Sequence, residues 1–126
     1  MPFIFVNGLP SSTSKAVLRQ IRVGIVEAVT ASLPQVPKSW TRPYFPADLL
    51  DEAPKNENEG AGTIYVRMDS AMFVGEKGYA TIKKRVIKAL CDVVWKALGG
   101  KFEVEGGICK LDEESMVLLP PSPSVG

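Results

Sequence analysis

The chain has 126 residues, of which 45% are hydrophobic and 23% charged, so it matches one globular domain rather than a disordered chain. The formal net charge is +1 without a block of like charges, which argues against nucleic acid or an anionic membrane surface as the main partner. Histidine is absent, which excludes Ser-His and Cys-His nucleophile pairs and every His-ligated metal site, and we expect neither a metal nor a cofactor.

Two further features bear on location. No apolar run approaches the roughly 20 residues that a membrane span requires, and the N-terminus lacks the cationic and apolar regions of a secretory signal. The two cysteines, Cys91 and Cys109, are too few for a disulfide framework. We therefore expect a cytoplasmic protein that does not contact a membrane.

The first predicted strand is the apolar run 1–6, which ends at the turn signal Asn7-Gly8. Pro2 fits the first position of a strand, where a missing N–H costs little. If Met1 is removed, Pro2 carries a secondary amine, and burial lowers the pKa of such an amine, so that it can act as a general base near neutral pH. The alternative is that Met-Pro is merely how the chain begins.

A helix is predicted between the capping residues 11–14 and Pro34, because the residue before a proline avoids the helical region. Three charged residues fall mostly outside its apolar stripe, and we expect them to be solvated: Arg19, Arg22 and Glu27. The stripe itself recurs at helical spacing and consists of Leu18, Ile21, Ile25, Ala28 and Val29.

A second strand is expected over 40–45, which is rich in aromatic and β-branched residues. Pro43 and Pro46 lack ladder donors, so this strand should lie at a sheet edge or be irregular. Residues 46–50 are expected to form a turn or a short helical piece, and 51–62 an exposed, mobile loop.

The third strand is predicted over 63–74, where apolar and polar residues alternate, and a turn follows over 75–78. A second helix is expected over 79–98 and should stop at Gly99-Gly100. Its basic cluster at 83–88 is expected to be a solvated face. The apolar stripe of this helix consists of Ile82, Val86, Leu90, Val93 and Ala97.

The last strand is predicted over 101–105, with Gly106-Gly107 breaking or bulging it and 108–111 as a continuation. Residues 116–119 are expected to form a short strand or a docking segment. We take 1–119 as the domain and the proline- and serine-rich 120–126 as a flexible tail.

The predicted order is β-α-β-β-α-β, an α+β fold. Each β-α-β unit favours parallel strands with a right-handed crossover. Two such units place both helices on one face of a four-stranded sheet. No predicted element remains to cover the other face, so we expect the chain to form a closed homo-oligomer.

From about Pro2 to Val104 the chain resembles the tautomerase superfamily, whose members begin with Met-Pro and have this element order. The opening 1–7, with Pro10 further on, looks like the opening of macrophage migration inhibitory factor, and 46–50 is similar to the proline-containing segment after the second strand of that protein. Residues 37–42 are similar in spacing to the region of 4-oxalocrotonate tautomerase that carries a substrate-binding arginine.

The resemblance implies a homotrimer with active sites between subunits, Pro2 as the catalytic base and a small enol or keto acid as the substrate. The position of the family's arginine falls on Arg42, for which the structural alternative is a strand-end salt bridge. Arg67 is a second substrate-binding candidate, because a fixed guanidinium stabilises negative charge on oxygen. Its structural alternative is pairing with Asp69 or with a neighbouring subunit.

Three aromatic residues, Trp40, Tyr44 and Phe73, are expected to line an apolar pocket wall or simply the core. The chain also departs from the family: 11–13 lacks the arginine of 4-oxalocrotonate tautomerase, and Gln35 stands where macrophage migration inhibitory factor has a lysine. We therefore do not expect a doubly charged acid substrate.

Two other functions remain open at this point. Hydration or dehalogenation needs a carboxylate to activate water, for which Glu103, Glu105 and Asp112 are the candidates near the last strand. A non-catalytic oligomeric binding protein is the alternative of a different class. Retention of Met1 favours it, because Pro2 then has an amide nitrogen without basicity.

Overall fold

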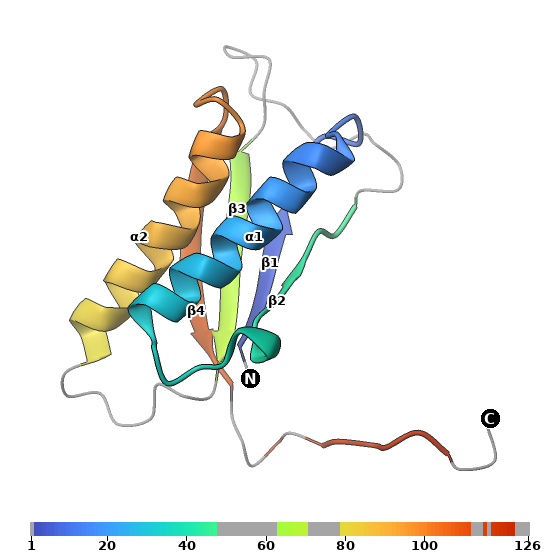
Figure 1. Cartoon of the computed structure of the whole chain (residues 1–126), viewed down its shortest axis with the longest axis vertical. Coiled ribbons are helices and arrows are strands. Elements are labelled where there is room, and N and C mark those ends of the chain that lie inside the picture. Colours follow the sequence, from blue (N-terminus) through green and yellow to red (C-terminus); the bar gives the residue numbers. More distant parts are fainter. Residues whose placement is uncertain (1, 48–62, 71–78, 112–114, 116, 123–126) are drawn as a thin grey trace.

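The structure, a computed structural model, describes residues 2–47, 63–70, 79–111, 115 and 117–122 (Figure 1). The elements follow one another as β1 (Phe3–Asn7), α1 (Lys15–Ser32), the 3-10 helix η1 (Lys38–Trp40), β2 (Arg42–Tyr44), β3 (Thr63–Ser70), α2 (Tyr79–Ala97) and β4 (Glu103–Lys110).

The four strands form one mixed sheet in the order β2-β1-β3-β4. β1 pairs in parallel with β2, and β3 pairs in parallel with β4, while the central pair of β1 and β3 is antiparallel. Both helices lie on the same face of this sheet (Figure 1). The predicted α+β fold is confirmed, and β2 lies at a sheet edge as its prolines indicated.

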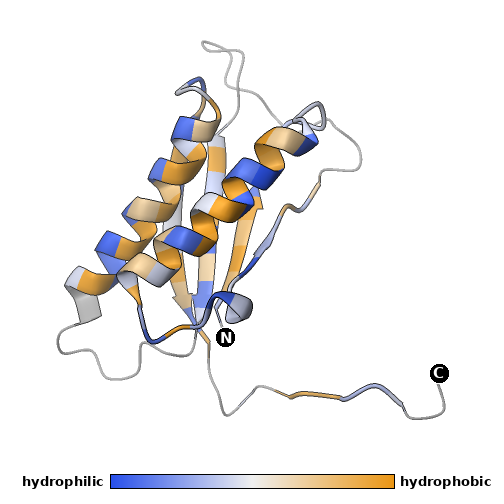
Figure 2. Ribbon diagram, viewed as in Figure 1, coloured by the Kyte–Doolittle hydropathy of each residue, from blue (hydrophilic) through white to orange (hydrophobic). Residues whose placement is uncertain are grey.

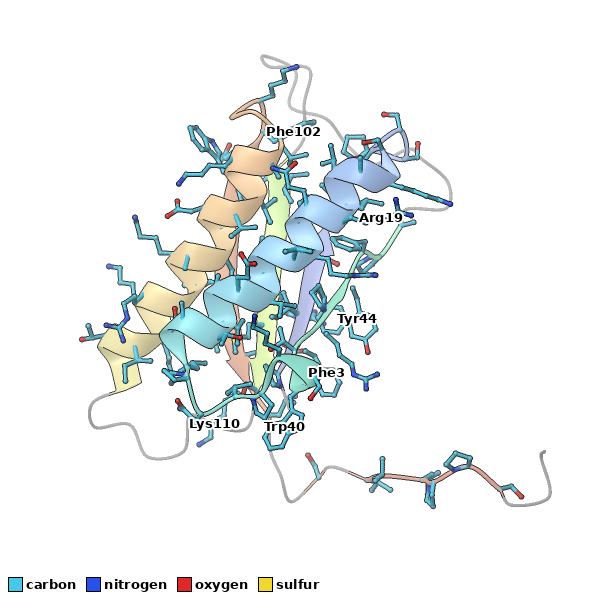
Figure 3. All side chains as sticks on the ribbon, viewed as in Figure 1. Phe3, Arg19, Trp40, Tyr44, Phe102 and Lys110 are labelled. Carbon is cyan, nitrogen blue, oxygen red and sulfur yellow. The ribbon has the colours of Figure 1, made fainter. Side chains whose placement is uncertain are left out.

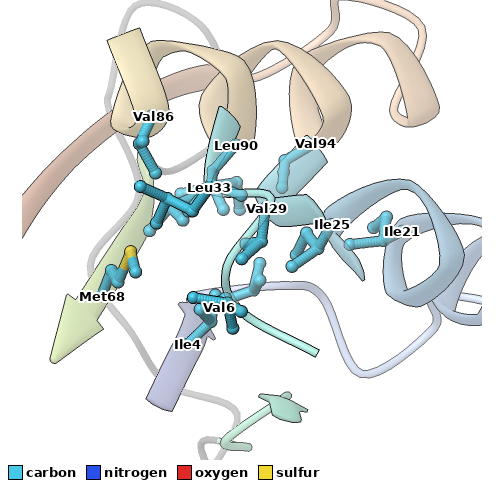
Figure 4. Packing of buried hydrophobic residues seen from close by; sticks show 13 residues of the cluster. Ile4, Val6, Ile21, Ile25, Val29, Leu33, Met68, Val86, Leu90 and Val94 are labelled. Atoms are coloured by element: carbon cyan, nitrogen blue, oxygen red, sulfur yellow. The ribbon is translucent and has the colours of Figure 1, made fainter. Parts of the chain in front are cut away.

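The core lies between the helices and the sheet. Register places Ile4 of β1 opposite Met68 of β3 and Val6 opposite Val66, and all four side chains are fully buried on the helix-covered face. The helices contribute further fully buried residues, several of which are labelled in Figure 4: Ile21, Ile25, Val29, Val86, Leu90 and Val94. Burial of these side chains is the main term that holds the layers together.

The helix ends follow the sequence signals. The Ser14 side chain accepts a hydrogen bond from the Val17 N–H at the start of α1, and the helix ends at Ser32, two residues before Pro34. The fully buried hydrophobic residues of both helices pack in the core, whereas Val23 of α1 and Trp95 of α2 are exposed. Figure 2 shows hydrophobic and hydrophilic residues along each helix. The fully buried residues of α2 among those described are Val86, Leu90 and Val94, whereas Val93, predicted in the stripe, is only half-buried.

Two predicted strands differ from those observed. Trp40 lies in η1, because the chain turns after Pro37 and the Trp40 N–H bonds to the Pro37 carbonyl. The segment 117–119 is not in a strand, and its side chains are 82–89% exposed. The alternative prediction of a docking segment stays a prediction.

The glycines of β4 do not break the strand. Glu103–Lys110 pairs continuously with β3 through Gly106 and Gly107. A Cβ on Gly106 would lie 2.6 Å from Cys91 Sγ and 2.9 Å from the Val66 carbonyl oxygen. Gly106 therefore serves the close approach of α2 to the sheet, and the predicted break or bulge is wrong.

Several predictions fall outside the described residues, namely the loop over 51–62 with the end of the 46–50 piece, the strand end at 71–74 with Phe73, the turn at 75–78, Asp112, Met116 and the end of the tail. Neither of the two described helices is long and apolar enough to cross a membrane.

No helix of the described residues lies on the second face of the sheet (Figure 1). Alternation along the strands puts Phe3 and Phe5 of β1 and Tyr65 and Arg67 of β3 on this open face, where each is half-buried. The open face is therefore partly apolar and has no cover from the described residues.

Candidate active site

Pro2 lies directly before β1 and is buried. Phe3 pairs with Arg42 in β2 and with Asp69 in β3, so continuing both registers by one residue places Pro2 between Thr41 and Ser70. A secondary amine at this position would be largely removed from water. Desolvation disfavours the protonated form of an amine and lowers its pKa.

Arg42 occupies the edge strand beside the start of β1. Its side chain is exposed on the open face, because the buried Pro43 that follows it turns toward the helices opposite Ile4. Among the described residues no salt bridge holds this guanidinium, so the strand-end salt bridge considered for Arg42 is not observed within that part of the chain.

An open groove of about 340 Å³ runs between α1 and β2. Its lining consists of Arg22, Val26, Thr41, Arg42, Pro43 and Tyr44. Two arginine residues thus line one groove next to the start of β1, and arginine is a side chain that suits the binding of a carboxylate. The sequence pattern assigned Arg22 to a solvated helix face and missed the groove, although Arg22 is indeed exposed and its guanidinium lies 5.8 Å from the Phe45 ring centre.

Arg67 lies on the open face, on the other side of β1 from Arg42. Its Nε is 3.1 Å from Asp69 Oδ1, and its guanidinium carbon lies 4.5 Å from the centre of the Phe5 ring. The Nε–Oδ1 pair is close but not aligned as a hydrogen bond, so it is held by charge. The pairing with Asp69 that the sequence offered as the structural alternative is therefore present.

The aromatic residues expected to form a pocket wall are spread over the same side of the molecule. Tyr44 lines the groove and stacks on Phe5 with ring centres 5.5 Å apart. Trp40 lies in η1 and is 49% exposed, so it is not part of the core. Figure 3 shows Phe3, Trp40 and Tyr44 on the side of the molecule where β1 and β2 lie.

The acidic candidates lie elsewhere. Glu103 and Glu105 pair with Thr63 and Tyr65, at the end of the sheet opposite Pro2, and both are exposed. Asp69 is the carboxylate that register places nearest to Pro2 among the described strands, but it is engaged with Arg67. Within one chain, a carboxylate free to activate water is therefore not supplied by the described strands beside Pro2.

A second groove of about 420 Å³ lies at the other end of the molecule, between the start of α1 and the end of α2. Ser12 and Thr13 line it together with Lys101 and Phe102. It is larger than the groove beside β2, but it lies at the end of the sheet opposite Pro2, so we do not assign the catalytic site to it. Groups of three or more metal-ligating side chains do not occur in the described part of the chain.

Comparison with known proteins gives structural but not sequence matches, because neither family models nor curated proteins match the chain. A fused 4-OT wild-type symmetric trimer is 18% identical, with a TM-score of 0.67 over 93% of this chain and 89% of that one. FG41 malonate semialdehyde decarboxylase inhibited by 3-bromopropiolate is 16% identical, with a TM-score of 0.63 over 97% and 91%.

A macrophage migration inhibitory factor-like protein from Entamoeba histolytica is 9% identical, with a TM-score of 0.59 over 86% of this chain and 89% of that one. At these identities the likeness establishes the fold. The fold that the sequence resemblance predicted is thereby confirmed.

Proposed function

On the premise of this tautomerase-type fold, we propose that the chain is a small tautomerase that uses Pro2, after removal of Met1, as a general base. The observation that carries the proposal is the burial of Pro2 at the start of β1, one residue away from the pairing of Phe3 with Arg42. A neutral secondary amine there takes a proton from a carbon next to a carbonyl and returns it elsewhere on the dienol. The substrate is a small enol or keto acid.

Arg42 is the residue that we propose to bind the substrate carboxylate or the oxygen on which negative charge develops. Arg42 is exposed and lines the groove, and its guanidinium is not in a salt bridge within the described residues. Arg22, which borders the same groove, would add a second positive charge. Arg67 remains a substrate-binding proposal, and its use would require the substrate to compete with Asp69 for the guanidinium.

We further propose that the active unit is a homotrimer. The open face of the sheet is partly apolar and is not covered by the described residues, and two fused 4-OT structures with the same fold are trimers. Burying half-buried aromatic side chains such as Phe3 and Phe5 against a second copy would supply the missing cover.

Replacement of Pro2 tests the base. We expect the native protein to have a mass that begins at Pro2 and to accelerate ketonisation of phenylenolpyruvate. Pro2→Ala should lower kcat/KM by roughly 100-fold or more, because the amine is then primary and the pyrrolidine ring no longer fixes its position, so that both its pKa and its orientation toward the substrate change. The measurements are intact mass of protein from the native source and a spectroscopic rate assay.

A form with Met1 retained is the matched control, since it keeps the proline ring but turns its nitrogen into an amide. This form should be as inactive as Pro2→Ala. Absence of activity on a panel of enols, with Pro2 confirmed as the first residue, would contradict the proposal and favour a non-catalytic binding protein. Native protein that retains Met1 would have the same implication.

Replacement of Arg42 tests substrate binding. Arg42→Gln should reduce kcat/KM by roughly 10- to 100-fold, as expected for the loss of a hydrogen bond to a charged group. Arg22→Gln should have a smaller effect in the same direction. Arg85→Gln, an exposed substitution on α2, is the control and should leave the rate unchanged. Equal rates for Arg42→Gln and Arg85→Gln would exclude Arg42 from the site.

A further inference from the structure

Buried polar side chains are rare in this molecule. Among the described residues only Thr41, 6% exposed, and Ser70, fully buried, are buried and polar. Continuing the two registers by one residue beyond Phe3 places both beside Pro2, Thr41 directly before β2 and Ser70 at the end of β3. The two buried polar side chains of the described residues thus lie around Pro2, directly before β1.

Thr41 and Pro2 belong to the same face of the sheet. Thr41 has extended backbone angles, and its N–H bonds to the Lys38 carbonyl oxygen at 3.2 Å. From Thr41 into β2 the burial alternates as buried Thr41, exposed Arg42 and buried Pro43, and Pro43 faces the helices. Pro2 is two residues before the buried Ile4, so alternation along the strand places it on the same, helix-covered face.

The hydroxyl of Thr41 is buried and unsatisfied. Thr41 Oγ1 has no hydrogen-bond partner among the described residues, which is unfavourable for the free energy of folding, and a partner would remove this cost. Ser70 differs, because it already takes part in an interaction. A free secondary amine on Pro2 would bring an N–H donor to the position next to Thr41.

We propose that Thr41 is a positioning residue whose hydroxyl oxygen accepts a hydrogen bond from the Pro2 amine. This rests on the proposed function, because it requires the free amine. In the neutral amine the single N–H points to Thr41 Oγ1, so the lone pair is left for the substrate proton. After proton transfer the amine has two N–H groups, of which one stays on Thr41 Oγ1 and the other returns the proton to the substrate.

Four charged residues of the described part of the chain lie near this pair. Arg42 and Asp69 lie one register step away on the open face, and Lys110 pairs with Ser70 on the far side of β3. Arg22 of α1 lines the same groove as Thr41. None of the four is replaced by substitutions at Thr41. A change in the amine's pKa after such a substitution therefore reports the hydroxyl.

Thr41→Val tests the proposal, because it replaces the hydroxyl with a methyl group of similar size. An accepted hydrogen bond favours the charged amine over the neutral one, so its loss should lower the pKa of Pro2 by roughly half a unit. We expect kcat to fall roughly tenfold with KM little changed, since Arg42 remains. Thr41→Ser, which keeps the hydroxyl, should have the same Pro2 pKa and kcat as the native protein.

The readouts are an NMR titration of ¹⁵N-proline-labelled protein that begins at Pro2 and the pH profile of kcat/KM. Thr63→Val is the matched control, because Thr63 is an exposed strand residue at the other end of β3 and should change neither. If Thr41→Val does not fold, Thr41→Ser and Thr41→Ala are compared instead, since these two differ in the hydroxyl but not in a methyl group.

An unchanged Pro2 pKa in Thr41→Val would overturn the proposal. A raised pKa would overturn it too, because it would mean that the hydroxyl donates to the lone pair and blocks the base. The titration does not require turnover. If the protein were inactive on every enol, the proposed function would fail, while the pKa of Pro2 would still decide whether Thr41 bonds to the amine.

Discussion

The two cysteines differ in how far the surrounding residues bury them, and burial affects the reactivity of a thiol. Cys91 lies on α2 and is half-buried, with its sulfur turned toward β4, whereas Cys109 is exposed on β4. Burial raises the pKa of the Cys91 thiol, and the negative charge of Asp92 adds to the rise. At a given pH a smaller fraction of this thiol is therefore ionised.

We expect Cys91 to react slowly with iodoacetamide in the folded protein. In a Cys109→Ser variant at about pH 7.5, the rate should be roughly tenfold or more below that of the same chain in urea, because the thiolate is the reactive form and burial limits access. Rates should rise as the pH is raised toward the elevated pKa. Equal rates in folded and unfolded protein would show that the thiol is neither shielded nor shifted.

At the residue scale the sequence predicted some partners and missed others. Arg67 and Asp69 are two apart on one strand, so alternation alone puts them on one face and their pairing could be anticipated. Thr41 and Pro2 become neighbours only through the register between segments 39 residues apart. A lone threonine carries no pattern from which this could be inferred, and the same holds for the groove beside Arg22.

At the scale of elements, helix limits were predictable because the signals are local. Ser14 caps α1, Pro34 follows its end, and Gly99 and Gly100 adopt positive φ after α2. Gly106 was misinterpreted because a glycine inside a strand pattern indicates either a bulge or a close approach. Only the packing of Cys91 and Ile87 on the strand distinguishes the two.

Alanine substitutions at the two neighbouring glycines of β4 should have different effects. A Cβ on Gly106 meets the Val66 carbonyl oxygen at 2.9 Å and Cys91 Sγ at 2.6 Å, so Gly106→Ala should lower the free energy of unfolding by about 2 to 3 kcal/mol. A Cβ on Gly107 meets only the Tyr65 hydroxyl at 3.1 Å on the open face.

Gly107→Ala should therefore change stability by no more than about 0.5 kcal/mol, since the end of the tyrosine side chain can move. Urea unfolding followed by circular dichroism measures both variants. A loss of equal size at the two positions would contradict the close approach of α2 as the reason for Gly106.

At the scale of the whole molecule, the two faces of the sheet differ in how they are covered. One face of the sheet is covered by two helices, whereas Phe5 contacts Tyr44 and Arg67 on the other face, which no helix or strand of the described residues covers. The sequence predicted this imbalance from the element order. It could not predict which side chains of the open face contact one another, because that depends on the register of all four strands.

We expect a solution mass close to three times 13.7 kDa for the native protein by light scattering. Phe5→Glu should shift it toward the single chain, because a charge on the open face would be desolvated in an interface. Val23→Glu is the matched control, since Val23 is a 55% exposed apolar residue on α1. A single-chain mass for the native protein, or dissociation by Val23→Glu, would contradict assembly through the open face.

The burial of Pro2 has a practical consequence for preparing the protein. A purification tag fused before Pro2 would be attached at a buried position next to β1. If Pro2 is the base that we propose, residues left over from the tag would also turn its amine into an amide. Residues 117–122 are exposed and extend away from the helices and sheet (Figure 1). The C-terminus is therefore the end that can carry a fusion without distorting the sheet.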